Sequence, residues 1–523
     1  MKLKLDKKFI WFAVSRNSEE RKLHFYLDNI KIAELDIRLD AYDPDFFFPM
    51  DVSRFKGKMI DIIGVDETSE GAISCNDLKP ETSYSFRPEI HFTAEYGWIN
   101  DPNGLIYADG VYHLYYQWNP YGTDWGNMHW GHAVSSDLIR WEHRPTAMEP
   151  DEYGTIYSGS AFRDSVNVSG FGKDALLFYY TASGGRNEWS LERGNLHTQR
   201  IAVSNDGGET LLKKETIIPN IIGENRDPKV FWHEKSGAYI MVLYLEETEF
   251  MILRSEDLLH WTESQRFCAD KMWECPNLME LLVRKQSGGD DRYESKWVFW
   301  SADGYYMIGE FDGYRFTPET EVLEAYDTKL PYAAQTYSGI EDRTVHIAWY
   351  RTENDKGGFR GMMSIPTELS LIETEEGLRI AFKPVKELCD RTRKLAAVRS
   401  GENISLTGRP VVAEIEYDAL NNKCDAVGTQ YDAPDTECDV PGPECEGVGT
   451  GTKTLTIRIG DSVLNIKNPE KKAVLIIDHG IIECLSEDGL RYTAIESEDD
   501  ILRKPIRIDS EEINVRMNIF EII

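Results

Sequence analysis

Short runs of apolar and aromatic residues, separated by polar turns, recur along the whole chain. The turns place glycine beside aspartate, asparagine or serine, as in "ADG", "NDGG", "KSG" and "FDG", which is the chemistry of reversals between strands. Long amphipathic helical patterns are missing, so the pattern predicts an all-β chain. The clearest predicted strands are "VYHLYYQW" (111–118), "ALLFYYTA" (175–182), "AYIMVLYL" (238–245), "KWVFWSA" (296–302) and "VHIAWYR" (345–351).

One internal repeat is visible. The stretch "SSDLIRWEH" (135–143) is echoed by "SEDLLHWTE" (255–263), and a weaker relative without the tryptophan, "SNDGGETL" (204–211), lies between them. A unit of several strands that recurs roughly every 60 residues is typical of propeller blades. The repeat therefore predicts a β-propeller but does not fix the number of blades.

The segments on either side of this region have a different character. Residues 1–82 contain short strand patterns joined by polar turns and predict a small N-terminal β-module. The propeller is expected over residues 83–385. Residues 386–523 predict a C-terminal β-sandwich, interrupted by a long insertion loop rich in glycine, proline and acidic residues at 424–452.

Charge and composition exclude several classes of partner. The 523 residues include 58 Lys and Arg against 90 Asp and Glu, a net charge of −32. Nucleic acids and anionic membranes need basic surfaces, so neither is an expected partner, whereas a neutral substrate is compatible with this charge. The start of the chain lacks the apolar run of a secretory leader, which predicts a cytoplasmic protein, or a secreted one if a signal has been removed. The eight cysteines form no metal-type pairs and are expected to be free thiols.

Three acids occupy unusual local settings. Asp101 lies in "WINDPNG", Asp227 in "ENRDPKVFW" and Glu274 in "MWECPNLMEL", and a proline follows each of them within two residues. An acid beside such a turn usually serves only the turn. These three, however, fall in different repeat units, and equivalent positions of propeller blades converge on the central channel. Converging carboxylates are typical of glycoside hydrolysis, in which one attacks or stabilises and another protonates the leaving oxygen.

Six motifs give the chain a resemblance to glycoside hydrolase family 32, the family of invertases, levanases and inulinases. They occur in the family's usual order, and the match is close over residues 87 to 385. The resemblance implies a five-bladed β-propeller with a β-sandwich behind it, and a retaining mechanism. The motifs are "HFTAEYGWINDPNGL", "YYQWNPYGTDWGNMHWGHAVSSDLIRW", "YSGSA", "RDPKV", "WECPNL" and "YAAQTY".

The resemblance also implies a role for individual residues. Asp101 resembles the nucleophile, Glu274 the general acid and base, and Asp227 the stabiliser of the transition state. No metal and no organic cofactor is implied. For the tryptophans, sugar contact is the favoured interpretation at Trp125 and core packing at Trp130, and the two interpretations are equal at Trp273. The positions that match sugar-binding residues of the family are Asn100, Gln117, Trp125, Ser158 and Arg226.

Parts of the chain depart from the family pattern. Asn277 stands where the family commonly has aspartate, and Leu211 where tryptophan is frequent. The stretch "VLIIDHGIIECLSEDG" (474–489) resembles a degenerate form of the family's late sandwich signature. Residues 1–82 resemble an additional β-module that precedes the catalytic domain in some bacterial members, and its role does not carry over.

The local sequences "NPYGTDWGNMHWGHA" and "PDEYGTIYSGSAF" are more similar to exo-acting fructan hydrolases than to plant-type invertases. The resemblance therefore implies release of terminal fructose from sucrose, fructo-oligosaccharides, inulin or levan, with sucrose and short fructans favoured. Two alternatives remain. A fructosyltransferase would use the same fructosyl-enzyme, and a non-catalytic fructan-binding propeller would use the fold without chemistry. The sequence leaves the oligomeric state open.

Overall fold

The computed structural model describes residues 1–81, 87–284, 294–419, 454–467, 472–497, 500–509 and 513–523. Strands dominate these residues, and the α-helices among them, α1 (Glu188–Leu191) and α2 (Lys386–Cys389), have four residues each. The predicted all-β fold is therefore confirmed. The predicted insertion at 424–452 lies outside the described residues. In the described part of the chain, no helix has the length and apolar character needed to cross a membrane.

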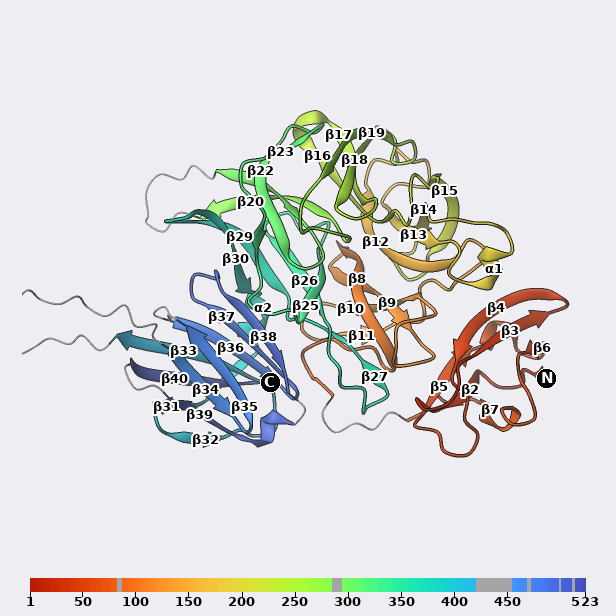
Figure 1. Ribbon diagram of the computed structural model, residues 1–523, viewed down its shortest axis with the longest axis horizontal. Helices are drawn as coiled ribbons and strands as arrows, with labels where there is room; N and C mark the ends of the chain where they lie inside the picture. Colours follow the sequence, from red (N-terminus) through yellow and green to blue (C-terminus); the bar gives the residue numbers. More distant parts are fainter. Residues whose placement is uncertain (82–86, 285–293, 420–453, 468–471, 498–499, 510–512) are drawn as a thin grey trace, which may run out of the picture.

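The first part of the chain forms two small sheets around a shared apolar core, in which Phe12, Phe25 and Phe48 are almost completely buried (Figure 1). Alternate residues of the strands point into this core, as half-buried sheets require. One sheet has the order β1 (Lys2–Lys4), β6 (Met59–Ile63), β3 (Arg21–Leu27) and β4 (Ile30–Ile37). The other has the order β5 (Phe46–Asp51), β2 (Phe9–Val14) and β7 (Ile73–Asn76). We refer to these two sheets as the N-terminal module.

Antiparallel sheets follow one another around a common centre in the middle of the chain, from orange through yellow to green in Figure 1. The first contains β8 (Gly97–Ala108), β9 (Val111–Asn119), β10 (His129–Ser135) and β11 (Glu142–His143), with β27 (Phe359–Arg360) beside β8. The second contains β12 (Thr155–Asp164), β13 (Ala175–Ser183), β14 (Thr198–Ser204) and β15 (Leu212–Ile218). The third contains β16 (Arg226–His233), β17 (Ala238–Tyr244), β18 (Glu249–Ser255) and β19 (Thr262–Cys268).

The remaining central strands belong to one larger, mixed sheet, because β20 pairs in parallel with β29. Its first part contains β20 (Asn277–Arg284), β21 (Ser295–Trp300), β22 (Tyr305–Phe311), β23 (Phe316–Pro318) and β24 (Leu323–Glu324). Its second part contains β25 (Pro331–Thr336), β26 (Thr344–Tyr350), β28 (Met362–Met363), β29 (Thr367–Thr374) and β30 (Gly377–Pro384). The five strands that the sequence predicts most clearly correspond to β9, β13, β17, β21 and β26, with ends that agree within two residues.

The sequence repeat marks the same turn in two sheets. Ser135 ends β10 and Ser255 ends β18, and the aspartate two residues later accepts hydrogen bonds from the backbone of the turn in both cases. Leu138 and Leu258 are fully buried and have positive φ angles of 64° and 68°. The shared serine, aspartate and leucine therefore build one structural unit, which explains why the echo spans several residues.

Hydrogen bonds from side chains join the strands around the centre to one another. The Asn103 Oδ1 atom accepts from the Gly159 N–H at 3.2 Å, and the Ser160 Oγ atom bonds to the backbone of β16. Lys229 Nζ donates to the Thr336 carbonyl at 2.6 Å, and Asn277 Nδ2 donates to the hydroxyl of the same threonine at 3.0 Å. These bonds fix β8, β12, β16, β20 and β25 relative to one another. Asn277, where the family commonly has aspartate, takes part in these bonds.

The C-terminal part is a sandwich of two sheets around an apolar core that includes Val411, Ile457, Leu475 and Met517. The larger sheet has the order β31 (Thr392–Arg399), β40 (Ile513–Ile522), β33 (Val411–Ala419), β36 (Lys472–Asp478), β37 (Ile481–Ser486) and β38 (Tyr492–Glu496). The smaller sheet has the order β32 (Asn403–Ser405), β39 (Pro505–Asp509), β34 (Thr454–Ile459) and β35 (Ser462–Lys467).

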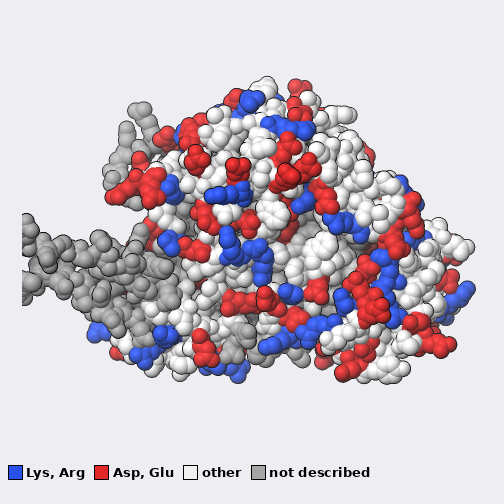
Figure 2. All heavy atoms as spheres, viewed as in Figure 1, with Lys and Arg blue, Asp and Glu red and all other residues white. Residues whose placement is uncertain are grey.

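The acidic excess of the chain is spread over its surface. Figure 2 shows acidic and basic side chains intermingled across one face of the molecule. Many acids of the described chain have basic partners, as where Lys296 contacts Glu310 at 2.6 Å and Glu319 at 2.7 Å. Exposed pairs of this kind contribute little individually to the free energy of unfolding. The described cysteines, which are Cys75, Cys268, Cys275, Cys389 and Cys484, are free thiols.

A buried histidine joins the sandwich to the start of the central region. His91 Nδ1 lies 3.0 Å from Asp478 Oδ2, its Nε2 lies 3.0 Å from Glu483 Oε1, and all three side chains are fully buried. Tyr350 also donates to Glu483. Burial alone would lower the pKa of His91, but the hydrogen bonds to both carboxylates outweigh it and raise the pKa to about 9. His91 is therefore an imidazolium at neutral pH, held by the segment that resembles the family's late sandwich signature.

We predict that this histidine makes stability depend on pH. Its pKa rises from 6.5 to about 9 on folding, so its contribution is complete below pH 6.5 and is lost as the pH rises towards 9. The expected loss is about 3 kcal/mol, which follows from the size of the shift. Denaturant unfolding of the wild type and of His91→Gln between pH 6 and 10 measures it, and the variant should lack the dependence.

His260→Gln is the matched control, because the side chain of His260 is 89% exposed and pairs only with Asp257 three residues away. This control should follow the wild-type curve. Parallel curves for the wild type and His91→Gln would show that the imidazolium does not link the two regions.

Candidate active site

A pocket of about 370 Å³ opens at the centre of the ring of sheets, and three carboxylates lie in it. All eight residues predicted from the sequence line this one pocket, namely Asn100, Asp101, Gln117, Trp125, Ser158, Arg226, Asp227 and Glu274. They come from β8, β9, β12 and β16, from the loop after β9 and from the segment before β20. Residues far apart in the sequence therefore meet at the centre, as the repeat pattern predicts.

Irregular backbone turns the carboxylates inward. The pairing of β8 with β9 shifts register between Ile99 and Pro102, around Asp101. A similar shift in the pairing of β16 with β17 follows Arg226, and Asp227 there has a φ of 64°. Bulges of this kind redirect side chains out of a regular ladder. The prolines that follow both aspartates in the sequence therefore mark positions where strands are interrupted, not where they end.

Glu274 is held by a different irregularity. It precedes β20, and both Glu274 and Cys275 have positive φ angles, of 32° and 46°. Residues other than glycine rarely adopt positive φ angles, and in folded proteins such strained conformations are enriched at functional sites. The Cys275 N–H donates to Asp227 Oδ2 at 3.0 Å, so the strained segment also holds the second acid in place.

Asp101 is surrounded by polar contacts. Asn100 Nδ2 donates to its Oδ1 atom at 3.0 Å, and the Ser158 hydroxyl donates to Oδ2. The Trp98 indole N–H in turn donates to Asn100 Oδ1 at 2.9 Å, which orients the amide so that its nitrogen faces the carboxylate. Burial and the nearby charge of Glu274 raise the pKa of Asp101 above its usual value. The apolar Ile99 beside this group is fully buried and anchors the strand.

Arg226 links the other two acids. Its Nη2 atom donates to Glu274 Oε2 at 2.7 Å, and its Nε atom lies 3.7 Å from Asp227 Oδ2. The Tyr332 hydroxyl donates to the second oxygen of Glu274. Burial lowers the pKa of Arg226, but the two carboxylates outweigh this effect and raise it. The guanidinium is therefore a fixed positive charge that holds Asp227 and Glu274 together.

Asp227 is the most deeply confined of the acids. Burial raises its pKa to about 7, because the charges of Glu274 and Asp101 add to the effect of burial while Arg226 opposes it. Cys275 Sγ lies 3.5 Å from Oδ2 of both Asp101 and Asp227. The two aspartates are thus neighbours across one sulfur atom. Burial therefore raises the pKa of both aspartates, Asp101 and Asp227.

Two buried donors in this pocket lack partners among the described residues. They are Gln117 Nε2 and the indole Nε1 of Trp349. Buried polar groups in proteins are nearly always hydrogen-bonded, so an unpaired donor that lines a pocket indicates a place for a ligand acceptor. Hydroxyl oxygens of a sugar would supply such acceptors. No group of three or more His, Cys, Asp or Glu suited to a metal ion occurs in the part of the chain that is described.

The sequence interpretation missed five residues that line the pocket, namely Tyr157, Arg186, Glu224, Tyr332 and Trp349. Tyr332 lies inside the quoted motif "YAAQTY", so its motif carried a signal that its residue type alone did not. Trp130 is fully buried and donates to the Tyr157 carbonyl, which makes it a core residue. Trp273 is 44% exposed, bonds to Asp303 and does not line the pocket.

The N-terminal module braces one rim of the pocket. Asn127 Oδ1 accepts from the Asp36 N–H at 2.8 Å, and Asn127 Nδ2 donates to the Asp36 carbonyl at 2.8 Å. Residues 120–127, which this pair secures, carry Trp125, whose side chain is 51% exposed at the pocket. On a neighbouring element, Glu34 of the module accepts from the first N–H groups of α1. The module therefore contacts the segment that carries Trp125 and the helix that begins two residues after Arg186, which lines the pocket.

Comparison with known proteins gives consistent matches. The description "Glycosyl hydrolases family 32 N-terminal domain" fits residues 91–384. A levanase from Bacillus subtilis is 41% identical over 335 residues, which are 58% of this chain and 47% of the levanase. The chain thus spans about half the length of this relative. The sequence similarity covers the pocket and the ring of sheets.

Solved structures share the fold more widely. An exo-inulinase from Aspergillus awamori superposes with a TM-score of 0.69 at 24% identity, covering 85% of this chain and 99% of that protein. A fructofuranosidase variant from Schwanniomyces occidentalis, complexed with fructosylnystose, gives a TM-score of 0.66 at 26% identity and covers 85% and 99%. These neighbours combine a β-propeller with a β-sandwich, and the described sheets of this chain have the same arrangement.

We predict that Asn127→Gly loosens the rim without disturbing the core. Asn127 has a φ of 42°, which glycine adopts freely, so the substitution removes the two hydrogen bonds to the module and the bond from Asn127 Nδ2 to Asn119 Oδ1 without straining the backbone. Amide exchange in residues 120–127 should become roughly ten-fold faster. Hydrogen exchange followed by mass spectrometry measures this change.

Asn29→Gly provides the control, because Asn29 also has a positive φ, of 65°, in the turn between β3 and β4. Exchange in residues 120–127 should remain as in the wild type. Equal exchange in both variants would mean that the module does not hold this segment.

Proposed function

The chain belongs to glycosyl hydrolase family 32, and on that premise we propose that it is a retaining β-fructofuranosidase. It would release terminal β-D-fructofuranosyl residues from sucrose, fructo-oligosaccharides and fructans. The observation that carries this proposal is the meeting of Asp101, Asp227 and Glu274 in one pocket around Arg226. Two or more carboxylates flanking a pocket suit the cleavage of a glycosidic bond through a transition state with positive charge on the sugar.

The relatives support a fructoside substrate. The levanase and the structure complexed with fructosylnystose both carry fructans or fructo-oligosaccharides in their names. In this chain, Gln117 and Trp349 offer unpaired buried donors beside the carboxylates, and Trp125 offers an exposed aromatic face at the rim. Donors and an aromatic surface together suit a neutral ring that carries hydroxyl groups.

In the first proposed step, an oxygen of Asp101 attacks the anomeric carbon of the fructosyl unit. The bond from that carbon to the glycosidic oxygen breaks, and Glu274 gives its proton to the leaving oxygen. Asn100 and Ser158 hold the Asp101 carboxylate in a fixed orientation for this attack. The product of the step is a fructosyl ester of Asp101, and the remainder of the substrate departs as an alcohol.

In the second proposed step, the oxygen of a water molecule attacks the same anomeric carbon while Glu274 accepts a proton from that water. The ester bond to Asp101 breaks, so the enzyme is restored and fructose leaves. Asp227 would accept hydrogen bonds from fructose hydroxyls, and Arg226 would keep its carboxylate beside Glu274. Positioning of this kind accelerates a reaction when the contacts strengthen in the transition state.

We also propose a three-part organisation of the chain, with residues 1–82 as the N-terminal module, 83–385 as the catalytic propeller and 386–523 as the sandwich. Five blades fit the strand pairing, because β8, β12, β16, β20 and β25 each begin a run of antiparallel strands near the centre. The fourth and fifth blades would be joined through the parallel pairing of β20 with β29.

The primary test is product analysis. We expect the purified chain to release free fructose from sucrose, kestose, inulin and levan, and Asp101→Asn to lose essentially all of this activity while keeping its fold. Chromatography of the products over time distinguishes the outcomes. Longer oligosaccharides growing from sucrose would identify a transferase, and inactivity on all four substrates, with binding retained, would identify a sugar-binding protein.

Glu274→Gln tests the proposed acid. The variant should cleave sucrose about 10²- to 10⁴-fold more slowly, because general acid catalysis contributes that much. A nitrophenyl β-fructofuranoside, whose leaving group needs little protonation, should be affected far less. Glu280→Gln, an exposed position six residues further on, serves as the control and should keep wild-type rates. Equal slowing on both substrates would contradict the assignment of Glu274 as the acid.

A further inference from the structure

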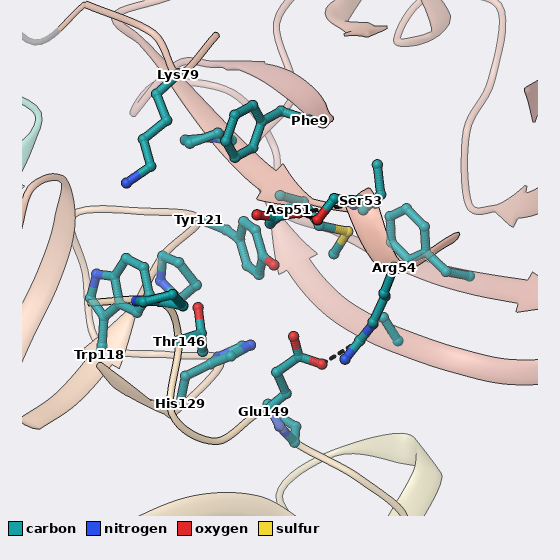
Figure 3. Close-up of a pocket in the computed structure, with 18 of the residues that line it drawn as sticks. Phe9, Asp51, Ser53, Arg54, Lys79, Trp118, Tyr121, His129, Thr146 and Glu149 are labelled. Carbon is teal, nitrogen blue, oxygen red and sulfur yellow. Dashed lines mark hydrogen bonds and ion pairs between the residues drawn. The ribbon is translucent and has the colours of Figure 1, made fainter. Parts of the chain in front are cut away.

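A second cavity, of about 250 Å³, lies between the N-terminal module and the sheet that contains β9 and β10 (Figure 3). Residues 49–55 of the module form one wall, and the other includes β9, the start of β10 and residues 143–150. It shares no lining residue with the carboxylate pocket within the described part of the chain. Strand β9 separates the two, since Gln117 faces the carboxylates while Tyr116 and Trp118 face this cavity.

Two polar groups in this cavity lack hydrogen-bond partners. His129 is 5% exposed, and its Nδ1 bonds to the Asn127 carbonyl, so Nδ1 carries the proton and Nε2 is an acceptor. Burial lowers the pKa of His129 to about 4, which keeps the ring neutral. Tyr121 is 7% exposed. No described residue hydrogen-bonds to His129 Nε2 or to the Tyr121 hydroxyl, and both atoms are accessible from the cavity, so they are available to a ligand there.

These two groups face the same space. Figure 3 shows Tyr121, His129, Thr146 and Glu149 turned towards one another across the cavity. The rings of Tyr121 and His129 meet edge to face, with centroids 5.8 Å apart. A donor and an acceptor that face one cavity suit a molecule with several hydroxyl groups, since each hydroxyl can both give and accept a hydrogen bond.

The rest of the lining favours a neutral ligand with apolar faces. Most charged side chains of the lining have a partner of opposite charge, as where Arg54 contacts Glu149 at 2.5 Å and Lys79 contacts Glu95, and the Asp51 carboxylate accepts hydrogen bonds from Ser53. The Trp118 indole N–H is already bonded to the Tyr96 carbonyl, so this residue has only its ring surface to offer. An aromatic surface packs well against the C–H face of a sugar ring, whereas an ion would lose its hydration in this cavity without gaining a partner of opposite charge.

We propose that this cavity binds a free monosaccharide, as a second site that takes no part in the hydrolysis. Its hydroxyls would donate to His129 Nε2 and accept from Tyr121, and a face of the ring would pack on Trp118. The cavity is slightly smaller than typical small-molecule pockets, which restricts the occupant to about one sugar ring. A ligand there contacts the N-terminal module and β9 together, so it would also strengthen their association.

Fructose and glucose are the probes, and Tyr121→Phe is the variant. Calorimetric titration of the full chain should detect a site for one of these sugars that Tyr121→Phe weakens about three- to ten-fold, as the loss of one hydrogen bond implies. Because the hydroxyl has no partner in the described protein, the variant should unfold at the wild-type temperature when no sugar is present. Tyr42→Phe, at a side chain that is 87% exposed, should leave binding unchanged.

Crystals soaked in the same sugars locate the site. A sugar ring between Trp118 and His129 supports the inference, whereas water alone, unchanged binding in Tyr121→Phe, or occupancy only at crystal concentrations overturns it. Density in the carboxylate pocket is read separately. Sugar in the carboxylate pocket but not in the cavity beside Trp118 would overturn this inference and leave the proposed function intact. Sugar in the cavity alone would support this inference and count against the proposed function.

Discussion

The ion pairs of Arg226 are the interaction on which the centre of this molecule depends. Three carboxylates share a confined pocket, and their mutual repulsion would separate them without a fixed positive charge among them. Arg226 reaches two of them, Asp227 and Glu274, while hydrogen bonds from Asn100 and Ser158 support Asp101. The bulges and positive φ angles around these residues are the conformational cost of this arrangement.

The surrounding fold keeps that arrangement rigid. Lys229 of β16 and Asn277 of β20 both donate to Thr336 of β25, so the strands that carry or adjoin Asp227 and Glu274 are held to one common strand. Successive side chains of β9 point to opposite faces of the sheet, so the two faces of this strand have different surroundings. One face reaches the carboxylates, and the other packs towards the N-terminal module. A single strand thereby couples the pocket to a part of the chain that contributes no acid to it.

Much of this could be predicted from the sequence, for identifiable reasons. The strands are short and strongly patterned, so β9, β13 and β17 were predictable nearly to the residue. The three acids stood out because a proline follows each of them within two residues. Arg186 and Trp349, which also line the pocket, could not be recognised in this way, because their local sequences resemble an ordinary turn and an ordinary core strand. The pairing of Asn127 with the Asp36 backbone was also beyond reach, since contacts between distant segments leave no local pattern in the sequence.

The buried contact between His91 and Asp478 joins segments 387 residues apart. A ribosome synthesises the chain from its N-terminus, so His91 and the backbone amides beside it emerge long before their carboxylate partners exist. During most of translation the entrance to the central region therefore carries unsatisfied polar groups. The buried contacts of His91 therefore form only after β36 and β37, which carry Asp478 and Glu483, have been synthesised, so completion of the central region depends on strands near the end of the polypeptide.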